Sequence, residues 1–430
     1  MYFNRIIIKN WRQFKSVNID FHPRLTVITG PNGSGKSTIL SLIALHLSTK
    51  QKDHFLATPV SDKDTGSILF TLSTLFKNIF STNKNNRNEN FQHSYIGEVH
   101  FNEGNYSKYF VNDPQGLQYE VNSTDKIQVN GFKIDSHRAA PVYQEVTYIP
   151  VSGIKPKDAF QDFARSQINY KQGKWEQRNG KGGVPNPLAS LKDALIGFAA
   201  FGADNSHMRA VPELVGLFEE FQEVLRIVLP EEIGFQKLEV RSPEIIIISK
   251  TGQFPIDSAS GGIMSLIQTA WQIFLFTKSY GKTAVVIIDE PENHLHPSLQ
   301  RDFLGNLVKT FLDVQFIVAT HSPFVITSVR ESKVYALQYA PLEEGVEGKA
   351  VNAQEIDFAS KARTADKILD EVLGVSVTLP VWAERDLKEI TSKFDNTELT
   401  EASIVELRRN LEEVGLSELF PEALGKIAHD

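Results

Sequence analysis

The sequence feature that most constrains the fold is a glycine-rich segment between two apolar runs, Gly30-Pro31-Asn32-Gly33-Ser34-Gly35-Lys36-Ser37-Thr38. Residues 25–29 before it have the character of a strand, and residues 39–45 after it have that of a helix. Glycines let the main chain curl so that its N–H groups point at an anion, and the dipole of the following helix adds positive potential there. The G-x-x-x-x-G-K-S pattern in this context therefore predicts a phosphate-binding loop rather than an ordinary glycine-rich turn.

This loop assigns roles to individual residues. Lys36 would place a positive charge on the β- and γ-phosphates of a nucleotide, and the Ser37 hydroxyl is placed to ligate Mg²⁺. The residues of this segment that we expect to contact the nucleotide are Asn32, Gly33, Ser34, Gly35, Lys36, Ser37 and Thr38.

Composition limits the class of protein. The chain has 430 residues, 41% apolar and 23% charged, a balance typical of a globular protein of two or three domains. It has no cysteine, which excludes disulfides, cysteine zinc sites and a thiol nucleophile. Since it has neither a run of 18 apolar residues nor a signal-peptide-like start, we expect a soluble, cytoplasmic protein. The net charge of −7 argues against a globally basic nucleic-acid coat protein, although a local basic groove is compatible with it.

A second group of chemically capable residues follows a wholly apolar run at 284–288. This run has the length of a central parallel strand, and it ends in Asp289 and Glu290. Ligands of open α/β folds bind at the carboxyl ends of strands, so both acids are expected at a site. Asp289 is predicted to hold Mg²⁺ through water, and Glu290 to orient or deprotonate an attacking water. The alternative is an acidic strand end without a catalytic role.

Two histidines, His294 and His296, come soon after these acids and close to Glu292. Histidines at i and i+2 with a nearby carboxylate can bind a metal ion. However, Pro297 has the character of the first residue of a helix, so the residues before it are expected to form the turn that leads into this helix. We therefore expect positioning or dimer contacts from these histidines rather than a metal site.

Two further segments complete a nucleotide site. Ser260, Gly261 and Gly262 stand just before an apolar helix, where a hydroxyl and main-chain N–H groups form an anion site. On their own these three residues indicate only a helix cap. His321, in Thr320-His321-Ser322-Pro323 after another apolar run, is placed to sense a γ-phosphate and steady the attacking water. Its alternative is a histidine of the core or of a cap.

The rest of the chain changes character along its length. Alternating runs predict an antiparallel meander over residues 96–129, after an Asn-rich polar loop at 81–90. Helices are expected over 155–230 with a glycine-rich loop at 180–183, followed by a hairpin at 235–249.

Several further elements are expected near the central sheet and at the C-terminal end. Val146–Pro150 would return to the central sheet, and Lys333–Leu337 would be an edge strand. Helices after about residue 355 carry two apolar stripes that either pack against each other or the core, or dock a partner. These stripes are Ala383, Leu387, Ile390 and Phe394, and Ile404, Leu407, Leu411 and Val414.

As a set, these motifs resemble those of ABC-type ATPases in the soluble branch that contains the SMC, Rad50, RecF and OLD (overcoming lysogenization defect) proteins. The phosphate loop matches the Walker A motif, Ser260-Gly261-Gly262 the signature, and Asp289-Glu290-Pro291-Glu292 with Leu295-His296-Pro297 the Walker B region. Thr320-His321-Ser322-Pro323 matches the switch histidine, and residues 8–14 resemble the first strand of that branch. Within it the chain is most similar to ATPase subunits of bacterial anti-phage systems such as Septu, Gabija and retron-associated modules.

Three departures limit what the resemblance implies. The stretch between Lys36 and Ser260 is far longer than in transporter ATPases. The glutamine that contacts Mg²⁺ after the second core strand is not evident, and Ser152 stands where it would be expected. The long coiled coil of SMC proteins is missing, and so are a D-x-D nuclease pair after residue 340 and an HNH-like cluster, while Asp62-Lys63-Asp64 lies in a polar loop.

The resemblance implies an α/β fold: a P-loop ABC-ATPase head with a mixed central sheet, an antiparallel β lobe, a helical insertion and a helical C-terminal tail. We expect an N-terminal ATPase lobe at 1–150, a helical insertion and hairpin at 151–250, and a C-terminal ATPase lobe at 251–345. A helical region at 346–430 would offer a docking surface. ATP and Mg²⁺ are the implied cofactors, with ATP held between Lys36 of one subunit and Ser260 of another.

The first functional hypothesis is a dimeric or higher homo-oligomeric ATPase that regulates a separately encoded effector, most simply a nuclease, in anti-phage defence. It is motivated by a complete set of ATPase motifs in a chain without effector chemistry. A RecF-like DNA repair ATPase that clamps DNA is the second hypothesis, and an ATP-bound scaffold with little hydrolysis is the third. Direct contact with DNA stays open, and membrane association is not expected.

Overall fold

The computed structural model describes residues 1–49, 54–61, 68–71, 93–112, 117–138, 143–146, 153–173, 176–178, 181–183, 186–204, 206–341, 349–356, 381–394 and 400–429. Contacts between residues divide the chain into two compact units, Met1–Ala365 and Asp366–Asp430. Among the described residues, no helix has the length and apolar character needed to cross a membrane.

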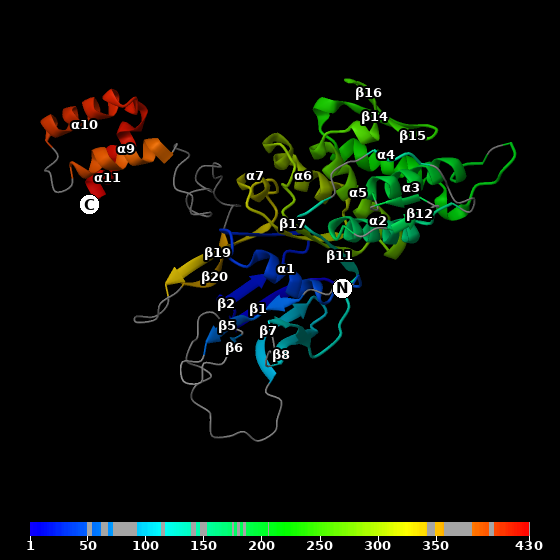
Figure 1. Ribbon diagram of the computed structural model, residues 1–430, viewed down its shortest axis with the longest axis horizontal. Helices are drawn as coiled ribbons and strands as arrows, with labels where there is room; N and C mark the ends of the chain where they lie inside the picture. The colour runs from blue at the N-terminus through cyan, green and yellow to red at the C-terminus, as the bar shows by residue number, and fades with distance from the viewer. Residues whose placement is uncertain are drawn as a thin grey trace, which may run out of the picture. The chain divides into compact units, whose positions relative to one another are not determined.

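The first unit is built on an eleven-stranded mixed sheet (Figure 1). In spatial order its strands are β10 (Val121–Ser123), β8 (Tyr106–Asn112), β7 (His93–Phe101), β1 (Phe3–Trp11), β2 (Phe14–Asp20), β20 (Lys349–Ile356), β19 (Lys333–Pro341), β3 (Leu25–Thr29), β18 (Val314–Ala319), β17 (Ala284–Asp289) and β11 (Gly131–Ile134).

The sheet changes from antiparallel to parallel along this order. β10, β8, β7, β1 and β2 pair antiparallel, and their side chains alternate between buried and exposed positions. β19, β3, β18, β17 and β11 run parallel, and β3, β17 and β18 are buried along their whole length. Burial on both faces explains why the sequence of β17 and β18 is almost continuously apolar.

α1 (Lys36–Ala44) follows β3 directly, so that the glycine-rich loop lies at the carboxyl edge of the parallel strands. The buried side of α1 joins a core formed with residues of β1, β2, β7 and β8. Small two-stranded pairs complete this lobe: β4 (Phe55–Leu56) with β9 (Gln118–Tyr119), and β5 (Thr58–Ser61) with β6 (Ile68–Thr71).

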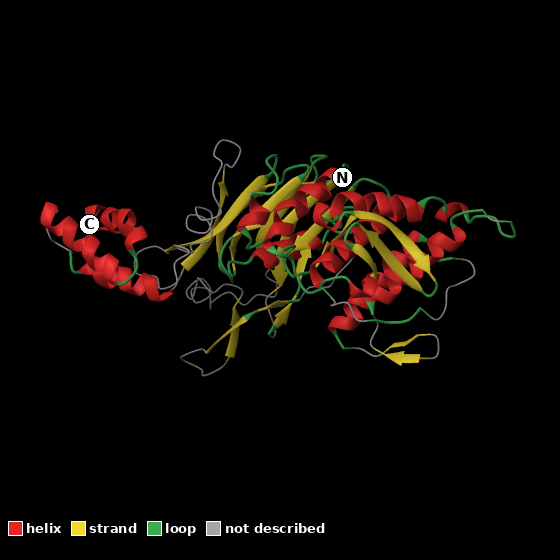
Figure 2. Cartoon of the chain, turned by 90° about the horizontal axis from the view of Figure 1, so that it is seen from above, coloured by secondary structure: helices red, strands yellow, loops and turns green. Residues whose placement is uncertain are grey.

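A helical layer packs beside the other part of the sheet (Figure 2). Its helices are α2 (Pro156–Lys171), α3 (Pro187–Phe201), α4 (Leu217–Val228), α5 (Gly261–Tyr280), α6 (Pro297–Thr310) and the short α7 (Pro323–Ile326). α5 is central, with Trp271 packed edge-on against Phe221 of α4 at 4.8 Å between ring centroids. The layer also holds the sheet of β14 (Phe235–Arg241), β15 (Glu244–Ser249) and β16 (Gly252–Pro255), and the pair of β12 (Glu176–Arg178) and β13 (Lys181–Gly183).

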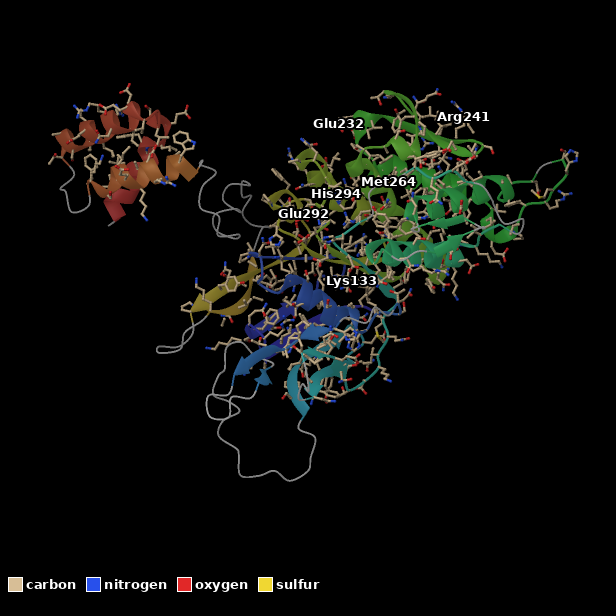
Figure 3. The ribbon with its side chains drawn as sticks, in the orientation of Figure 1. Lys133, Glu232, Arg241, Met264, Glu292 and His294 are labelled. Carbon is tan, nitrogen blue, oxygen red and sulfur yellow. The ribbon has the colours of Figure 1, made fainter. Side chains whose placement is uncertain are left out.

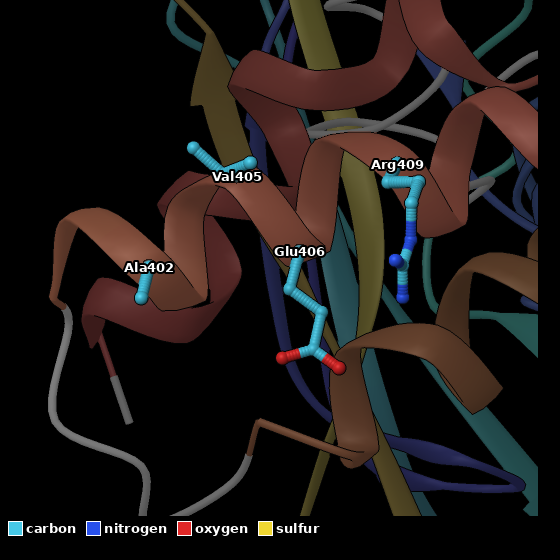
Figure 4. A pocket seen from close by; sticks show the side chains of 4 residues that line it. All are labelled: Ala402, Val405, Glu406 and Arg409. Atoms are coloured by element: carbon cyan, nitrogen blue, oxygen red, sulfur yellow. The ribbon is translucent and has the colours of Figure 1, made fainter.

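The second unit has a small core of its own. Its helices are α9 (Val381–Ser392), α10 (Glu401–Glu413) and α11 (Phe420–His429). The two predicted apolar stripes meet there, because Ala383, Leu387, Ile390, Phe394, Leu407 and Leu411 form one buried cluster. Packing against each other is therefore the interpretation that the structure supports. On its outer side α10 carries a hollow of about 790 Å³ lined by Ala402, Val405, Glu406 and Arg409 (Figure 4).

The predicted fold class is confirmed: this is an α/β fold with a mixed central sheet, an antiparallel lobe, a helical layer and a helical C-terminal unit. Most predicted elements form, among them the hairpin of β14 and β15 and the long helix α5. The boundary between the two compact units falls at 365/366 rather than at 345/346, because β20 pairs with β19 and β2 and so belongs to the first unit. The division into four segments stays a prediction.

Some local predictions are wrong. Lys333–Leu337 does not form an edge strand, because β20 covers its outer side. The glycine-rich loop expected at 180–183 contains β13, and the last strand of the meander, at 126–129, is reduced to an isolated bridge between Leu47 and Val129. β11, which the sequence did not predict, occupies the place beside β17. Val146 is described without strand structure, and residues 62–67, 81–90 and 147–152 lie outside the described residues.

Candidate nucleotide site

Three glycines of the phosphate loop have backbone angles that disfavour other residues. φ is +140° at Gly30, +78° at Gly33 and +96° at Gly35. A Cβ atom at Gly35 would lie 2.3 Å from Cζ of Phe14, and one at Gly30 would lie 2.4 Å from the carbonyl oxygen of Leu337. The loop therefore packs closely against β2 on one side and β19 on the other, and there is no room for a side chain at Gly30 or Gly35.

Two side chains, one from the turn between β1 and β2 and one from β19, contact the middle of the loop. Nε2 of Gln13 donates a hydrogen bond to the carbonyl oxygen of Gly33 at 3.2 Å, and the Tyr339 hydroxyl donates to that of Asn32 at 3.4 Å. Asn32 and Ser37 are exposed, whereas the Ser34 hydroxyl is fully buried and has no hydrogen-bond partner in the described part of the chain. A buried hydroxyl without a partner is costly, so this group is suited to a ligand that supplies one.

Lys36 lies folded back into the loop. Its Nζ donates to the carbonyl oxygens of Gly30 at 3.0 Å and Pro31 at 3.2 Å, and lies 3.5 Å from Nδ1 of His321. Burial lowers the pKa of Lys36 to about 8, against the opposing charges of Asp289, Glu290 and Glu292. The carbonyl oxygens of the loop thus accept hydrogen bonds from the Lys36 ammonium group, and phosphate oxygens would compete with them for it.

Asp289 ends β17 beside the start of α1. Ser37 lies close to its carboxylate, and one carboxylate oxygen, Oδ1, is buried without a partner among the described residues. Burial raises the pKa of Asp289, with Ser37 and the charge of Lys133 opposing the rise. An adjacent hydroxyl and a carboxylate with a free oxygen form a donor set that suits a hard cation such as Mg²⁺. The residues present therefore fit the implied metal ion.

Glu290 has a main-chain conformation that is unusual for a residue with a side chain. Its φ is +48°, a left-handed value that costs roughly 1–2 kcal/mol. Its N–H donates to the carbonyl oxygen of Ala319 at 2.8 Å, which links the ends of β17 and β18. Its carboxylate accepts a hydrogen bond from Nδ2 of Asn293 at 2.9 Å. The hydrogen bond from Asn293 thereby fixes the orientation of this half-buried carboxylate.

Glu292 contacts the main chain at His321. Its Oε1 accepts a hydrogen bond from the N–H of His321 at 2.7 Å, whereas its Oε2 is buried without a hydrogen-bond partner among the described residues. Burial raises the pKa of Glu292 and lowers that of His321, where the charge of Lys36 acts in the same direction. A neutral imidazole is therefore presented toward the lysine of the phosphate loop.

The signature segment lies at the start of α5. Ser260 caps the helix by accepting a hydrogen bond from the N–H of Ile263 at 3.4 Å, as the helix-cap alternative predicts. Ser260 and Gly261 are exposed, and a Cβ atom at Gly261 would meet no atom within 4 Å. Gly262 instead faces the turn after Glu290, with 3.0 Å from a Cβ position to the carbonyl oxygen of His294. The exposed end of α5 is thus compatible with both a cap and an external anion.

The two neighbouring histidines lie in different local surroundings. His296 caps α6, which begins at Pro297 as predicted, and its Nδ1 lies 2.9 Å from the Ser298 hydroxyl. His294, labelled in Figure 3, lies on the turn after β17, is exposed and has a φ of +70°. Within the described residues, no group of three or more acids and histidines could hold a metal ion.

Two residues of this region were not found from the sequence. Asn293 joins the Glu290 carboxylate to the segment after β11, because its Nδ2 also donates to the carbonyl oxygen of Ser136 at 3.1 Å. Arg138, on that same segment, is buried against Glu290 and Pro291. Neither belongs to a motif. The sequence signal for Arg138 would have been its place soon after β11, the strand next to β17. Because β11 has only four residues, this strand was itself not predicted.

Comparisons with known proteins agree with this geometry. The model of the RecF/RecN/SMC N terminal domain matches residues 2–340. Retron Ec83 probable ATPase of Escherichia coli is 45% identical over 56 residues, which are 13% of this chain and 10% of that protein. Septu protein PtuA of Bacillus mycoides is 24% identical over 143 residues, 32% of this chain and 19% of that protein. The chain thus matches only a small part of either relative, so the activities and partners of those whole proteins do not transfer directly.

A solved structure, the SMC head domain from Thermotoga maritima, is 16% identical to this chain. The likeness covers 83% of this chain and 100% of that one, with a TM-score of 0.39. A score this low adds nothing to the fold assignment, which rests on the sheet order and the phosphate loop.

Proposed function

Because the chain belongs to the RecF/RecN/SMC N-terminal domain family, we propose that it binds and hydrolyses ATP between the phosphate loop and the acidic end of β17. The observation that carries the proposal is the convergence of three sequence segments at one edge of the sheet: the phosphate loop, the end of β17 with the turn after it, and His321. Lys36 lies beside His321, Ser37 lies close to Asp289, and Glu292 holds the main chain of His321. An ordinary glycine-rich turn would not require these partners.

Each residue has a role in this proposal. Lys36 and the loop N–H groups bind the β- and γ-phosphates, and Ser37 with Asp289 holds Mg²⁺. Bound Mg²⁺ neutralises phosphate charge and fixes the geometry of the γ-phosphate. Glu290 orients or deprotonates the attacking water, and neutral His321 donates a hydrogen bond to the γ-phosphate.

The test is the release of phosphate from Mg²⁺-ATP by the purified chain, compared with Lys36→Ala. We expect hydrolysis by the natural chain and none above background by the variant. Equal rates for the two proteins would assign the activity to a contaminant, and no release by either would contradict hydrolysis.

We further propose that two chains enclose ATP, with Ser260 of one subunit on the nucleotide bound by the other. The exposure of Ser260 and Gly261 at the N-terminus of a 20-residue helix supports this arrangement. Helix N-termini attract anions, and the open space at Gly261 leaves room for a γ-phosphate to approach.

For the biological role we propose control of a separate effector, most simply a nuclease, in anti-phage defence. The similarity to a retron ATPase and to a Septu protein supports this setting. The C-terminal unit is the proposed docking region, because Trp382 and Val405 remain 55% and 64% exposed outside its core.

The experiment is a pull-down of the tagged chain, expressed with its neighbouring genes and ATP, followed by the mass of the complex. A co-purifying nuclease supports effector control, whereas a purified chain that cuts DNA alone contradicts the division of labour. A bare oligomer whose hydrolysis is stimulated by DNA in a salt-dependent way would instead support a RecF-like repair ATPase. The presence of RecF in the matching family favours keeping that second candidate.

A further inference from the structure

Arg138 lies where the signature helix meets the turn that carries Glu290. Its Nη1 donates to the hydroxyl of Ser265 in α5 at 2.7 Å and to the carbonyl oxygen of Pro291 at 3.3 Å. Its Nη2 lies 3.5 Å from the carbonyl oxygen of Glu290. One guanidinium group therefore joins the second turn of α5 to two successive peptide groups after β17.

This contact is buried. Arg138 is 9% exposed, and burial lowers its pKa to about 10, opposed by the charges of Glu292, Asp289 and Glu290. The group stays protonated at neutral pH, although taking a guanidinium out of water is costly unless it is paired. The contacts of this buried cation with main-chain oxygens of a strained turn indicate that it holds the turn in place.

A second link reaches the same turn from the same segment. Nδ2 of Asn293 donates to the carbonyl oxygen of Ser136 at 3.1 Å and to the Glu290 carboxylate at 2.9 Å. The main chain of Glu290 is thus held through Arg138, and its side chain through Asn293. Because a positive φ at a residue with a side chain is unfavourable, the turn needs such restraints to keep one conformation.

We infer that Arg138 is a positioning residue that holds Glu290 where it can activate the water that attacks ATP, and that it couples the position of Glu290 to that of the helix α5. The inference rests on the proposed ATPase function. Ser265 lies five residues after Ser260, so a shift of the start of α5 on contact with a nucleotide would move a direct partner of Arg138. Arg138 would pass that shift to the main chain of Glu290.

Three variants test this coupling. Ser265→Ala removes one hydrogen bond of Arg138 and keeps its charge, Arg138→Lys keeps the charge but cannot span both partners, and Arg138→Gln removes the charge. Ser279→Ala is the matched control, since it makes the same change on the same helix, where the hydroxyl contacts only the carbonyl oxygen of Leu275. Each protein is compared for kcat and KM with Mg²⁺-ATP and for nucleotide affinity.

We expect kcat to fall roughly threefold in Ser265→Ala and roughly 10- to 100-fold in Arg138→Gln, with Arg138→Lys between them. KM and nucleotide affinity should stay near those of the natural chain. In a Glu290→Gln background Ser265→Ala should lower the residual rate no further, because the group it positions has been removed. Unchanged kcat in Ser265→Ala and Arg138→Lys, or equal falls with and without Glu290, would overturn the inference.

Hydrogen–deuterium exchange of residues 289–294 separates this inference from the ATPase proposal. Loss of the guanidinium contacts should speed exchange there in Ser265→Ala and Arg138→Lys, and Ser279→Ala should match the natural chain. If the natural chain does not hydrolyse ATP but exchange is faster in these two variants, the restraint by Arg138 is supported and the ATPase function is rejected. Unchanged exchange would reject the restraint whether or not ATP is hydrolysed.

Discussion

Lys36 shows how one residue can be held ready for an anion. Its ammonium contacts two loop carbonyl oxygens, and burial lowers its pKa to about 8. Carbonyl oxygens carry only partial negative charge, so phosphate oxygens are the stronger partners for the same group. The acids that surround it, Asp289, Glu290 and Glu292, keep the charged form present at neutral pH.

Replacing Lys36 by Ala should abolish nucleotide binding. The loss of a charged hydrogen-bond donor buried at the phosphates is expected to weaken affinity about a hundredfold or more. The measurement is titration with a fluorescent ATP analogue. Lys282→Ala, at an exposed position, is the control for loss of a positive charge. Binding by Lys36→Ala at the affinity of the control would mean that the nucleotide lies elsewhere.

The lowered pKa of Lys36 also predicts how ATP binding depends on pH. Phosphates favour the ammonium, so the pKa of Lys36 is higher in the complex than the value of about 8 in the free chain. Below pH 8 the group is already charged, and its effect on affinity is constant. Above pH 8 binding must take up a proton, so affinity should fall by up to about tenfold per pH unit.

The same titration in Lys36→Arg provides the control, because arginine stays protonated through this range. This variant should bind more weakly, with an affinity that does not change between pH 7 and 9.5. An equally steep fall in both proteins would trace the pH dependence to another group.

At the scale of elements, the sequence predicted what a local pattern can show. The continuous apolar runs of β17 and β18 and the glycine pattern before α1 are local signals, and they placed the parallel strands and the phosphate loop. β11 and β20 were missed because they are short or mixed in polarity and are recognised only by pairing with distant strands. Arg138 was missed for the same reason, since its partners lie 127 and more residues away.

The fit between the phosphate loop and the first hairpin gives a prediction at this scale. In Gly35→Ala the new methyl group would lie 2.3 Å from Cζ of Phe14 and 2.6 Å from Nε2 of Gln13, at a φ of +96°. Phe14 is fully buried and cannot move away easily. We expect a loss of roughly 1–3 kcal/mol in stability and at least a tenfold loss in ATP affinity, measured by thermal unfolding and nucleotide titration.

Gly104→Ala is the matched control for that experiment. Gly104 also has a positive φ, +81°, but a Cβ atom there meets nothing within 4 Å. It should cost about 1 kcal/mol of backbone strain and leave ATP affinity unchanged. ATP affinity in Gly35→Ala equal to that of Gly104→Ala would show that the close fit of the loop is not required for binding.

At the scale of the whole molecule, the two units differ in how they use their apolar surface. The C-terminal unit buries six of the eight residues of its two predicted stripes in its own core, which removes those six as a docking face. The first unit instead leaves Ser260 and Gly261 exposed at the start of its most central helix. If this end of α5 binds an anion, as proposed, a nucleotide on the phosphate loop of a second copy would complement it.

Glu290→Gln should therefore trap an ATP-bound dimer. The amide keeps the size and hydrogen bonding of the side chain but cannot accept a proton, so ATP would persist between the subunits. Light scattering after size-exclusion chromatography should give the mass of two chains or a multiple of it with Mg²⁺-ATP, and a lower mass with ADP. Adding Ser260→Arg should prevent assembly without loss of ATP binding, because a large side chain would fill the open end of α5. Hydrolysis by Glu290→Gln at the natural rate would reject Glu290 as the base, and an unchanged mass with bound ATP would reject the shared nucleotide.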